Sequence, residues 1–125
     1  MFIRDVRRCE RLAALDSTDL CELIHPYREY EDLKMAYSLA HAVLRPGERS
    51  RPHRLETSSE VYYILEGEGT IHVGSESAGV YPGHAVYIPP GSVQYIENGG
   101  DENLSFLCIV SPPWRPEDDE EEDTL

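Results

Sequence analysis

The sequence predicts a single all-β domain, and three observations lead to this prediction. The chain has 125 residues, which is an ordinary size for one domain. Short runs of β-prone residues recur roughly 8–12 residues apart, a spacing that is typical of sandwiches and barrels. Gly, Pro or Asn residues separate most of these runs. We therefore expect an antiparallel β-barrel with one compact core.

The first third of the chain gives the weaker signals. We expect a short helix over residues 5–15, whereas residues 18–24 fit either a strand or a helical turn, because periodicity does not distinguish the two. Residues 35–44 are rich in alternating small and apolar side chains and predict a strand. The Arg-Pro-Gly-Glu segment at residues 45–48 then predicts a turn.

The rest of the chain contains five clearer strands. They are expected at residues 60–65, 70–73, 85–88, 93–97 and 104–110. Several of these runs are apolar on both faces, so one face can fill the barrel while the other needs a cover. A second sheet or a partner subunit could provide that cover, and we expect a homodimer.

Charge and hydropathy exclude several classes of partner. The formal net charge is −13, so phosphate backbones would be repelled and nucleic-acid binding is not expected. No apolar run is long enough to span a bilayer, and the basic N-terminus lacks the apolar segment of a signal peptide. We therefore expect no membrane association and a cytoplasmic location.

Much of the negative charge lies at the C-terminus. Residues 117–123 are seven consecutive acids, and such a block repels itself and stays solvated. We expect residues 1–116 to form the domain, with an N-terminal extension, and residues 117–125 to form a disordered tail. The alternative is that this tail pairs with the arginines of the N-terminal segment, namely Arg4, Arg7, Arg8 and Arg11.

Cysteine usage predicts no cross-link. The chain contains Cys9, Cys21 and Cys108, an odd number with no Cys-x-x-Cys pair. We expect reduced, mostly buried thiols, as in a reducing compartment.

Two stretches have a more specific spacing than general β texture. The first places fixed residue types at Gly47, His53, Leu55, Glu60 and Gly67. The second places them at Gly83, Pro89, Gly91, Gln94 and Asn98.

This double pattern resembles the cupin superfamily, and in particular its small single-domain members, including those described as mannose-6-phosphate-isomerase-like. The resemblance implies a double-stranded β-helix, or jelly roll. It also implies an interior site at positions 53, 55, 60 and 94, which metal-binding cupins usually fill with His, His, Glu and His.

Two of these four positions depart from the pattern. His53 and Glu60 match, whereas Leu55 cannot bind a metal and Gln94 offers only a neutral amide oxygen. One interpretation is a reduced metal site in which His53, Glu60 and Gln94 bind a divalent ion (Mn, Fe, Ni, Cu or Zn) together with water. The other is a hydrogen-bonded polar pair, His53 and Glu60, in a barrel that binds no metal.

Strand alternation predicts a mostly apolar pocket around this site, because residues two apart face the same side of a strand. Its expected lining is Ala40, Ala42, Leu55, Tyr62, Ile64, Ile96, Phe106 and Cys108. Arg49, Arg51 and Arg54 are either ordinary surface residues or a means of drawing an anionic ligand to the pocket mouth.

Three functions remain open from the sequence. The first is a metal-dependent enzyme acting on a small polar molecule such as a sugar or a carboxylate. The second is a non-catalytic, metal-free binding module for the same kind of ligand. The third is a metal-free isomerase or epimerase that uses His53 as base and Tyr62 as acid.

Overall fold

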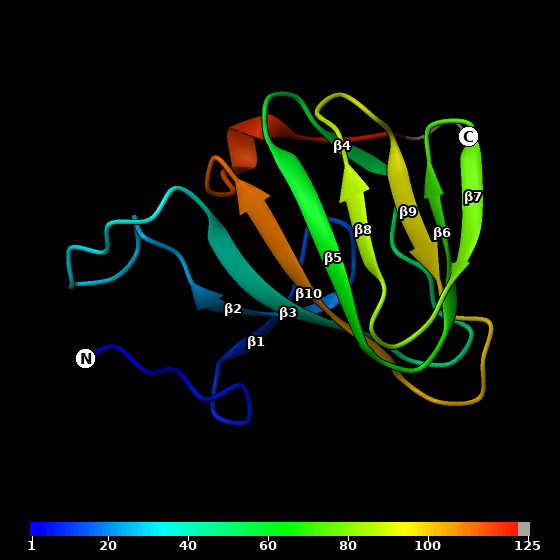
Figure 1. Ribbon diagram of the computed structural model, residues 1–125, viewed down its shortest axis with the longest axis horizontal. Coiled ribbons are helices and arrows are strands. Elements are labelled where there is room, and N and C mark those ends of the chain that lie inside the picture. Colours follow the sequence, from blue (N-terminus) through cyan, green and yellow to red (C-terminus); the bar gives the residue numbers. More distant parts are fainter. Residues whose placement is uncertain (123–125) are drawn as a thin grey trace.

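The computed structural model describes residues 1–122 and shows two antiparallel sheets that face each other (Figure 1). The six-stranded sheet contains, in spatial order, β1 (Arg11–Ala13), β2 (Asp19–Ile24), β3 (Ser38–Leu44), β10 (Leu104–Ser111), β5 (Ser59–Glu66) and β8 (Ala85–Ile88). The five-stranded sheet contains β11 (Asp119–Glu121), β4 (His53–Leu55), β9 (Gln94–Glu97), β6 (Gly69–Val73) and β7 (Glu76–Val80).

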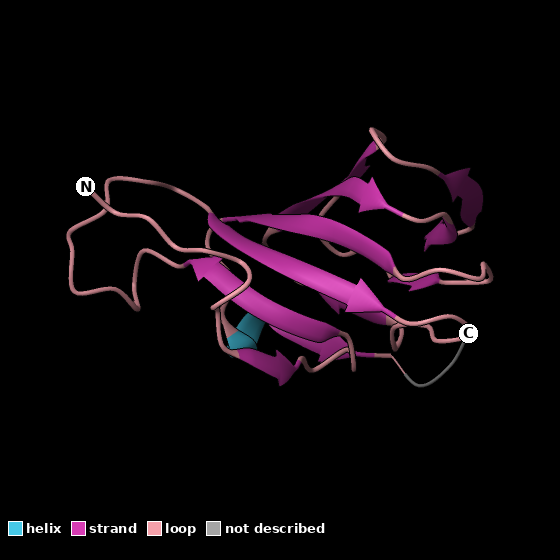
Figure 2. Cartoon of the chain, turned by 90° about the horizontal axis from the view of Figure 1, so that it is seen from below, coloured by secondary structure: helices cyan, strands magenta, loops and turns pink. Residues whose placement is uncertain are grey.

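This architecture is the double-stranded β-helix that the motif spacing predicts. Chain neighbours such as β8 and β9 lie in different sheets, so the chain winds back and forth between the two layers. The only helical segment in residues 1–122 is the 3₁₀ turn η1 (Pro116–Asp118), which stands out in Figure 2 among strands and loops. Among these described residues, no helix has the length and apolarity needed to cross a membrane.

The inner faces of both sheets form one core. On β5 the buried side chains are Glu60, Tyr62 and Ile64, in strict alternation with more exposed neighbours. The core cluster consists of Ala42, Leu44, Tyr62, Ile64, Ile71, Val80, Ile88, Ile96, Leu104, Phe106 and Cys108. Three residues expected to line a pocket, Ala42, Ile64 and Ile96, are therefore part of close-packed interior.

The β5–β6 turn shows why the motif needs glycine at position 67. Gly67 has a φ of +78°, a conformation that other residues rarely adopt. A Cβ atom at this position would also collide with the backbone of Asn103. The turn therefore brings the start of β6 against the loop that precedes β10.

The expected helix at residues 5–15 is wrong. Residues 6–9 form turns, and Arg11–Ala13 form β1, which pairs with β2 from Arg11 opposite Cys21 to Ala13 opposite Asp19. Residues 18–24, which were ambiguous in the sequence, contain strand β2. Pairing with a neighbouring strand satisfies the backbone hydrogen bonds of these short segments, and local sequence does not reveal that neighbour.

The outer face of the six-stranded sheet carries exposed aromatic side chains. Tyr63 on β5 is 41% exposed and Tyr87 on β8 is 63% exposed. The second sheet covers only the inner face, so the homodimer stays a prediction from the sequence.

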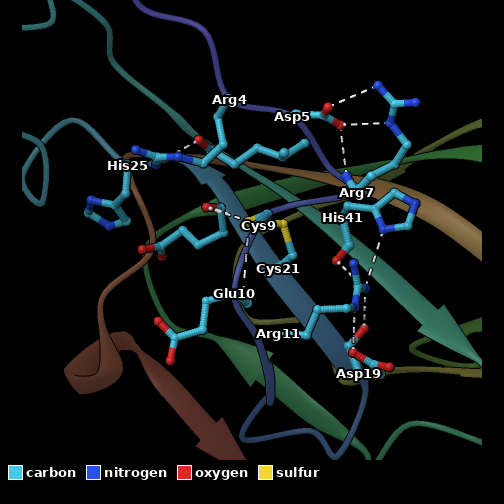
Figure 3. The surroundings of a disulfide bond; sticks show 12 residues. Arg4, Asp5, Arg7, Cys9, Glu10, Arg11, Asp19, Cys21, His25 and His41 are labelled. Atoms are coloured by element: carbon cyan, nitrogen blue, oxygen red, sulfur yellow. Dashed lines mark hydrogen bonds and ion pairs between the residues drawn. A yellow bond between two sulfur atoms is a disulfide. The ribbon is translucent and has the colours of Figure 1, made fainter.

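The cysteines differ from the sequence-based expectation. Cys9 and Cys21 form a disulfide, with Cα atoms 5.9 Å apart, that attaches the N-terminal segment to β2 (Figure 3). Cys21 on β2 lies opposite His41 on β3. Only Cys108 is a free, buried thiol. Sequence counting missed the pair because the two cysteines are twelve positions apart, and the pairing of β1 with β2, which places Arg11 opposite Cys21, brings them together.

A thiol titration tests this pairing. Unreduced protein, unfolded in denaturant, is expected to show one reactive thiol per chain, that of Cys108, although the chain contains three cysteines. After treatment with dithiothreitol the count should rise to three. A count of three without reductant would contradict the disulfide, and Cys108→Ser, which should give zero before reduction, is the matched control.

Candidate ligand-binding site

A cavity of about 350 Å³ opens on the inner face of the six-stranded sheet. It lies where β3 and β10 carry small side chains: Ala40 is opposite Cys108, which in turn is opposite Tyr62. Two small residues next to a large one leave space that the second sheet does not fill. The volume is at the low end of the range for small-molecule sites.

Two segments outside the two sequence motifs cover the cavity. Leu12, Leu15 and Leu20, from the β1–β2 hairpin, form one apolar wall, and Trp114 and Pro116 form part of another. The hairpin turn holds Ser17 at a φ of 70°, which places Asp16 and Thr18 along the cavity. The cavity is therefore closed by the N-terminal and C-terminal parts of the chain.

The acidic C-terminal segment is not a disordered tail in the part that the structure describes. We call residues 114–122 the C-terminal strap. Strand β11 pairs with β4, with Asp119 opposite Leu55 and Glu121 opposite His53. The remaining residues of the predicted tail, 123–125, lie outside the described residues.

Side chains of the strap explain why it is ordered despite its charge. Buried Asp118 accepts hydrogen bonds from the backbone nitrogens of Thr57 and Ser58 at 2.8 and 3.0 Å and from the Thr57 hydroxyl at 2.7 Å. These bonds outweigh the effect of burial and lower the pKa of Asp118. Hydrogen bonds to a carboxylate stabilise its negative charge, so the acidic strap can pack against the domain.

Ion pairs extend along the strap. Arg51 lies 2.9 Å from Glu121 and Arg54 lies 3.3 Å from Glu120. The partners of Glu120 and Glu121 are therefore two arginines close to the first motif, and not the N-terminal arginines of the alternative considered from the sequence.

His53 lies at the centre of the polar end of the cavity. Its Nδ1 atom hydrogen-bonds Asp119 Oδ1 at 2.8 Å, and its Nε2 atom is 3.4 Å from Asp16 Oδ2 without making a hydrogen bond to any described residue. Burial lowers the pKa of His53. The Asp119 hydrogen bond and the negative charges of Asp16, Asp119 and Glu60 raise it by more than burial lowers it, so the pKa is about 9. The imidazole is therefore a buried cation at neutral pH.

Both carboxylates around His53 have further partners. Asp119 Oδ2 accepts a hydrogen bond from Trp114 Nε1 at 2.9 Å. Asp16 Oδ1 accepts hydrogen bonds from the backbone nitrogen and the hydroxyl of Thr18, at 3.1 and 2.7 Å. The resulting network links the strap, β4 and the N-terminal hairpin at one place.

A second buried network lies beside the first. The Tyr62 hydroxyl donates to Gln94 Oε1 at 2.8 Å, and Gln94 Nε2 donates to Glu60 Oε1 at 3.0 Å. The other carboxyl oxygen, Glu60 Oε2, makes no hydrogen bond to the described residues, and Glu60 lines the cavity. Burial raises the pKa of Glu60 to about 7, against the opposing charge of His53 and the Gln94 hydrogen bond.

The structure brings six of the predicted site residues together along the cavity. They are His53, Glu60, Ala40, Tyr62, Phe106 and Cys108. Gln94 is fully buried behind Glu60 and does not reach the cavity wall, and Leu55, Ala42, Ile64 and Ile96 also do not.

The donor set does not fit the metal that the resemblance implies. The only atom of Gln94 able to bind a metal, Oε1, already accepts the Tyr62 hydroxyl, and its amide nitrogen faces Glu60. Within residues 1–122, no group of three or more His, Cys, Asp or Glu side chains is arranged to hold an ion. His53 hydrogen-bonds Asp119 and Glu60 hydrogen-bonds Gln94, so the two residues have separate partners and do not form the hydrogen-bonded pair of the second interpretation.

Sequence reasoning missed two important residues of the site, Asp16 and Asp119. Asp119 was read as part of a solvated acidic run, and Asp16 lies in a segment without any motif. The Pro-Pro-Trp ending is the one available signal, because a lone Trp beside a β-barrel commonly buries its ring and needs a partner for its N–H group.

Fold and site together define a double-stranded β-helix with an interior cavity. A family model described as a cupin domain matches residues 40–110. An uncharacterized protein from Methanocaldococcus jannaschii is 40% identical over 105 residues, which cover 84% of this chain and 82% of that relative. The chain belongs to the cupin family.

Other similar proteins differ in what their names describe. An oxalate-binding protein from Thermotoga maritima is 34% identical over 67 residues, which cover 54% of this chain and 55% of that protein. Among solved structures, a polyketide cyclase from Streptomyces resistomycificus has a TM-score of 0.79 at 21% identity, covering 100% of this chain and 87% of the other. A predicted oxalate decarboxylase from Thermotoga maritima has a TM-score of 0.75 at 24% identity, covering 90% and 99%. Identities this low establish the shared fold alone.

Proposed function

We propose that this cupin binds a small organic molecule in the cavity and holds the polar group of that ligand at Glu60. The observation that carries the proposal is a carboxyl oxygen, Glu60 Oε2, that has no partner among the described residues and lies in an otherwise mostly apolar cavity. Apolar cavities with a few converging polar groups and perturbed pKa values are the usual form of a ligand site.

Three features of the surrounding residues support the same proposal. Glu60 and His53 are held in place by hydrogen bonds to Gln94 and Asp119, so the polar end of the cavity is already organised for a ligand. The apolar side chains of Leu12, Leu20 and Phe106 in the cavity wall would contact the body of the ligand. The names of the oxalate-binding relative and of the polyketide cyclase also describe proteins that engage small organic molecules.

Ligand screening with a matched pair of variants tests the proposal. Compounds that raise the melting temperature of the wild-type protein should lose at least tenfold in affinity with Glu60→Gln, measured by calorimetry. Glu66→Gln makes the same chemical change at an exposed position at the end of β5 and should bind as the wild type does. Equal affinities for both variants would show that the ligands bind elsewhere, and the proposal would fail.

We also propose that binding takes place without a resident metal, because Gln94 Oε1 is engaged by Tyr62 and Leu55 has no donor atom. Metal analysis of purified protein, before and after dialysis against a mild chelator, should find far less than one equivalent of any transition metal. One equivalent that is retained by the wild type and lost in His53→Ala would overturn this part and restore the reduced metal site.

Proton transfer is the second candidate function, favoured by the pKa of Glu60 at about 7. An acid whose pKa lies near neutrality can give and take a proton with similar ease. Tyr62 is less suited to this role than the sequence suggested, because its hydroxyl is committed to Gln94 and burial raises its pKa well above the usual value. Deuterium uptake from D₂O into a bound ligand, lost in Glu60→Gln, would distinguish an enzyme from a binding module.

A further inference from the structure

We propose that the ligand is a molecule with an apolar body of one or two rings and a single hydroxyl or carbonyl group, and is not a carboxylate or another anion. This inference rests on the proposed function, since it names the chemical class that the same cavity accepts. It follows from how the charges and hydrogen-bond donors around the cavity are already used.

Charges at the polar end of the cavity are predominantly negative. Asp16, Asp119 and Glu60 surround one cation, His53, which interacts with Asp119 at 2.8 Å and with Asp16 at 3.4 Å. Two carboxylates therefore already face the single imidazolium. An anionic ligand placed beside Glu60 would add another negative charge to a site in which negative charge is already in excess.

The other cation that lines the cavity is also paired. Arg28 Nη1 lies 3.0 and 3.1 Å from the two carboxyl oxygens of Glu22, and both side chains lie on the cavity wall. The arginines of the first motif do not change this balance, because Arg51 and Arg54 form ion pairs with Glu121 and Glu120 of the strap. An anion entering from solvent would have to displace one of these carboxylates.

Hydrogen-bond donors near the polar end are committed in the same way. Thr18 donates to Asp16, Trp114 Nε1 donates to Asp119, and Gln94 Nε2 donates to Glu60. The Ser38 hydroxyl accepts from the Trp114 backbone nitrogen, and no hydrogen bond among the described residues uses its hydrogen. His53 Nε2 makes no hydrogen bond among the described residues, but it is buried and lies 3.4 Å from Asp16 Oδ2. The other free groups of the cavity are one carboxyl group and one neutral hydroxyl donor, which suit a ligand hydroxyl or carbonyl.

The remaining walls are apolar and select the body of the ligand. Leu12, Leu15 and Leu20 face the cavity from the N-terminal hairpin, and Phe106 and Val110 face it from β10. A sugar would leave several hydroxyl groups against these walls without partners, at a cost for each one. A compact ring system with one polar group fills about 350 Å³ without that cost.

Three probes with the same ring system separate the classes of ligand. They are 2-naphthalenemethanol, 2-naphthoate and 2-naphthylmethylamine, measured by calorimetry or ligand-observed NMR with full-length protein, and oxalate is added as a fourth probe. We expect the alcohol to bind at least tenfold more tightly than 2-naphthoate, and oxalate to show no binding. Tighter binding of 2-naphthoate, of oxalate or of the amine would overturn the inference while leaving a ligand site in place.

A variant links the result to the named charge. Glu60→Gln keeps the shape of the side chain and removes its negative charge, so at about pH 8, where Glu60 is mostly ionised, the preference for alcohol over 2-naphthoate should shrink at least fivefold. Glu66→Gln, on the same strand but outside the cavity, should keep the wild-type ratio. An unchanged ratio in Glu60→Gln would overturn the inference. Failure of all four probes and of the wider screen to bind the wild type would instead defeat the proposed function itself.

Discussion

Asp119→Ala is expected to lower the free energy of unfolding by about 3–5 kcal/mol, the usual effect of removing one partner from a buried ion pair. The change leaves the His53 imidazolium without its hydrogen-bond partner and leaves Trp114 Nε1 without an acceptor. It also removes one side-chain link between the strap and β4 beside the cavity, while the backbone pairing of β11 with β4 remains. Urea denaturation followed by tryptophan fluorescence measures the loss, because Trp114 is the only tryptophan in the chain.

The neighbouring residue provides the control. Glu120 is adjacent on β11, but its side chain is half exposed and its partner, Arg54, lies 3.3 Å away at the surface. Glu120→Ala should therefore cost about 1 kcal/mol or less. Equal small effects of the two substitutions would contradict the ordered strap and favour the solvated tail that the acidic run suggests.

Stability should fall as the pH rises from slightly acidic to alkaline values, and the deprotonation of His53 is one of two causes. The pKa of His53 is about 9 in the folded protein against an ordinary value of 6.5. A raised pKa means that the folded state binds the proton more tightly than the unfolded state. The stabilisation is therefore fully present below pH 6.5 and is lost as the pH passes through 9. At 1.4 kcal/mol per pKa unit, the loss is about 3 kcal/mol.

Glu60 acts in the same direction at lower pH. Its pKa rises from 4.5 to about 7 on folding, chiefly through burial, so its contribution is present below pH 4.5 and is lost as the pH passes through 7. Asp118 has the opposite sign: its lowered pKa stabilises the fold above pH 3.8, and this contribution disappears in stronger acid. Together these shifts place the greatest stability near pH 4, where Asp118 is ionised and Glu60 and His53 are still protonated in the folded protein.

Denaturation midpoints measured from pH 4 to pH 10 check this profile. The decline between pH 6.5 and pH 9 should be absent in His53→Gln, which keeps a hydrogen-bonding group but cannot carry the charge. The decline at lower pH should disappear in Glu60→Gln. A wild-type profile that is flat or rises toward pH 9 would show that His53 is not a buried cation.

Local sequence signals predicted the strands of the two motifs well and the first part of the chain poorly. Residues 85–88 are β8 as expected, and residues 60–65 lie within β5. Their alternation is determined by neighbours along the same strand, so a short window contains the needed information. β1 and the disulfide depend instead on where the first residues meet β2, which is a contact between segments whose pairing no local pattern reveals.

The candidate site divides in the same way. Motif spacing brought His53 and Glu60 to one side of the barrel, and the structure places both along the cavity. It also predicted Gln94 as a neighbour, and Gln94 does hydrogen-bond Glu60, although from behind the cavity wall. A spacing pattern locates a side chain on a strand face, but it does not determine which of its atoms remain free for a ligand.

By itself the sequence determined the all-β architecture, the cupin resemblance and the places of His53 and Glu60, because each depends on residue types at short, regular separations within strands. Only the tertiary structure decided what surrounds His53. Asp16 and Asp119 lie 37 residues before and 66 residues after it, and the folded chain brings both carboxylates to the same imidazole. Electrostatic interactions act through space and do not depend on distance along the chain. In an isolated segment Asp16 and Asp119 would be solvated, whereas in the folded protein they are the partners of a buried cation.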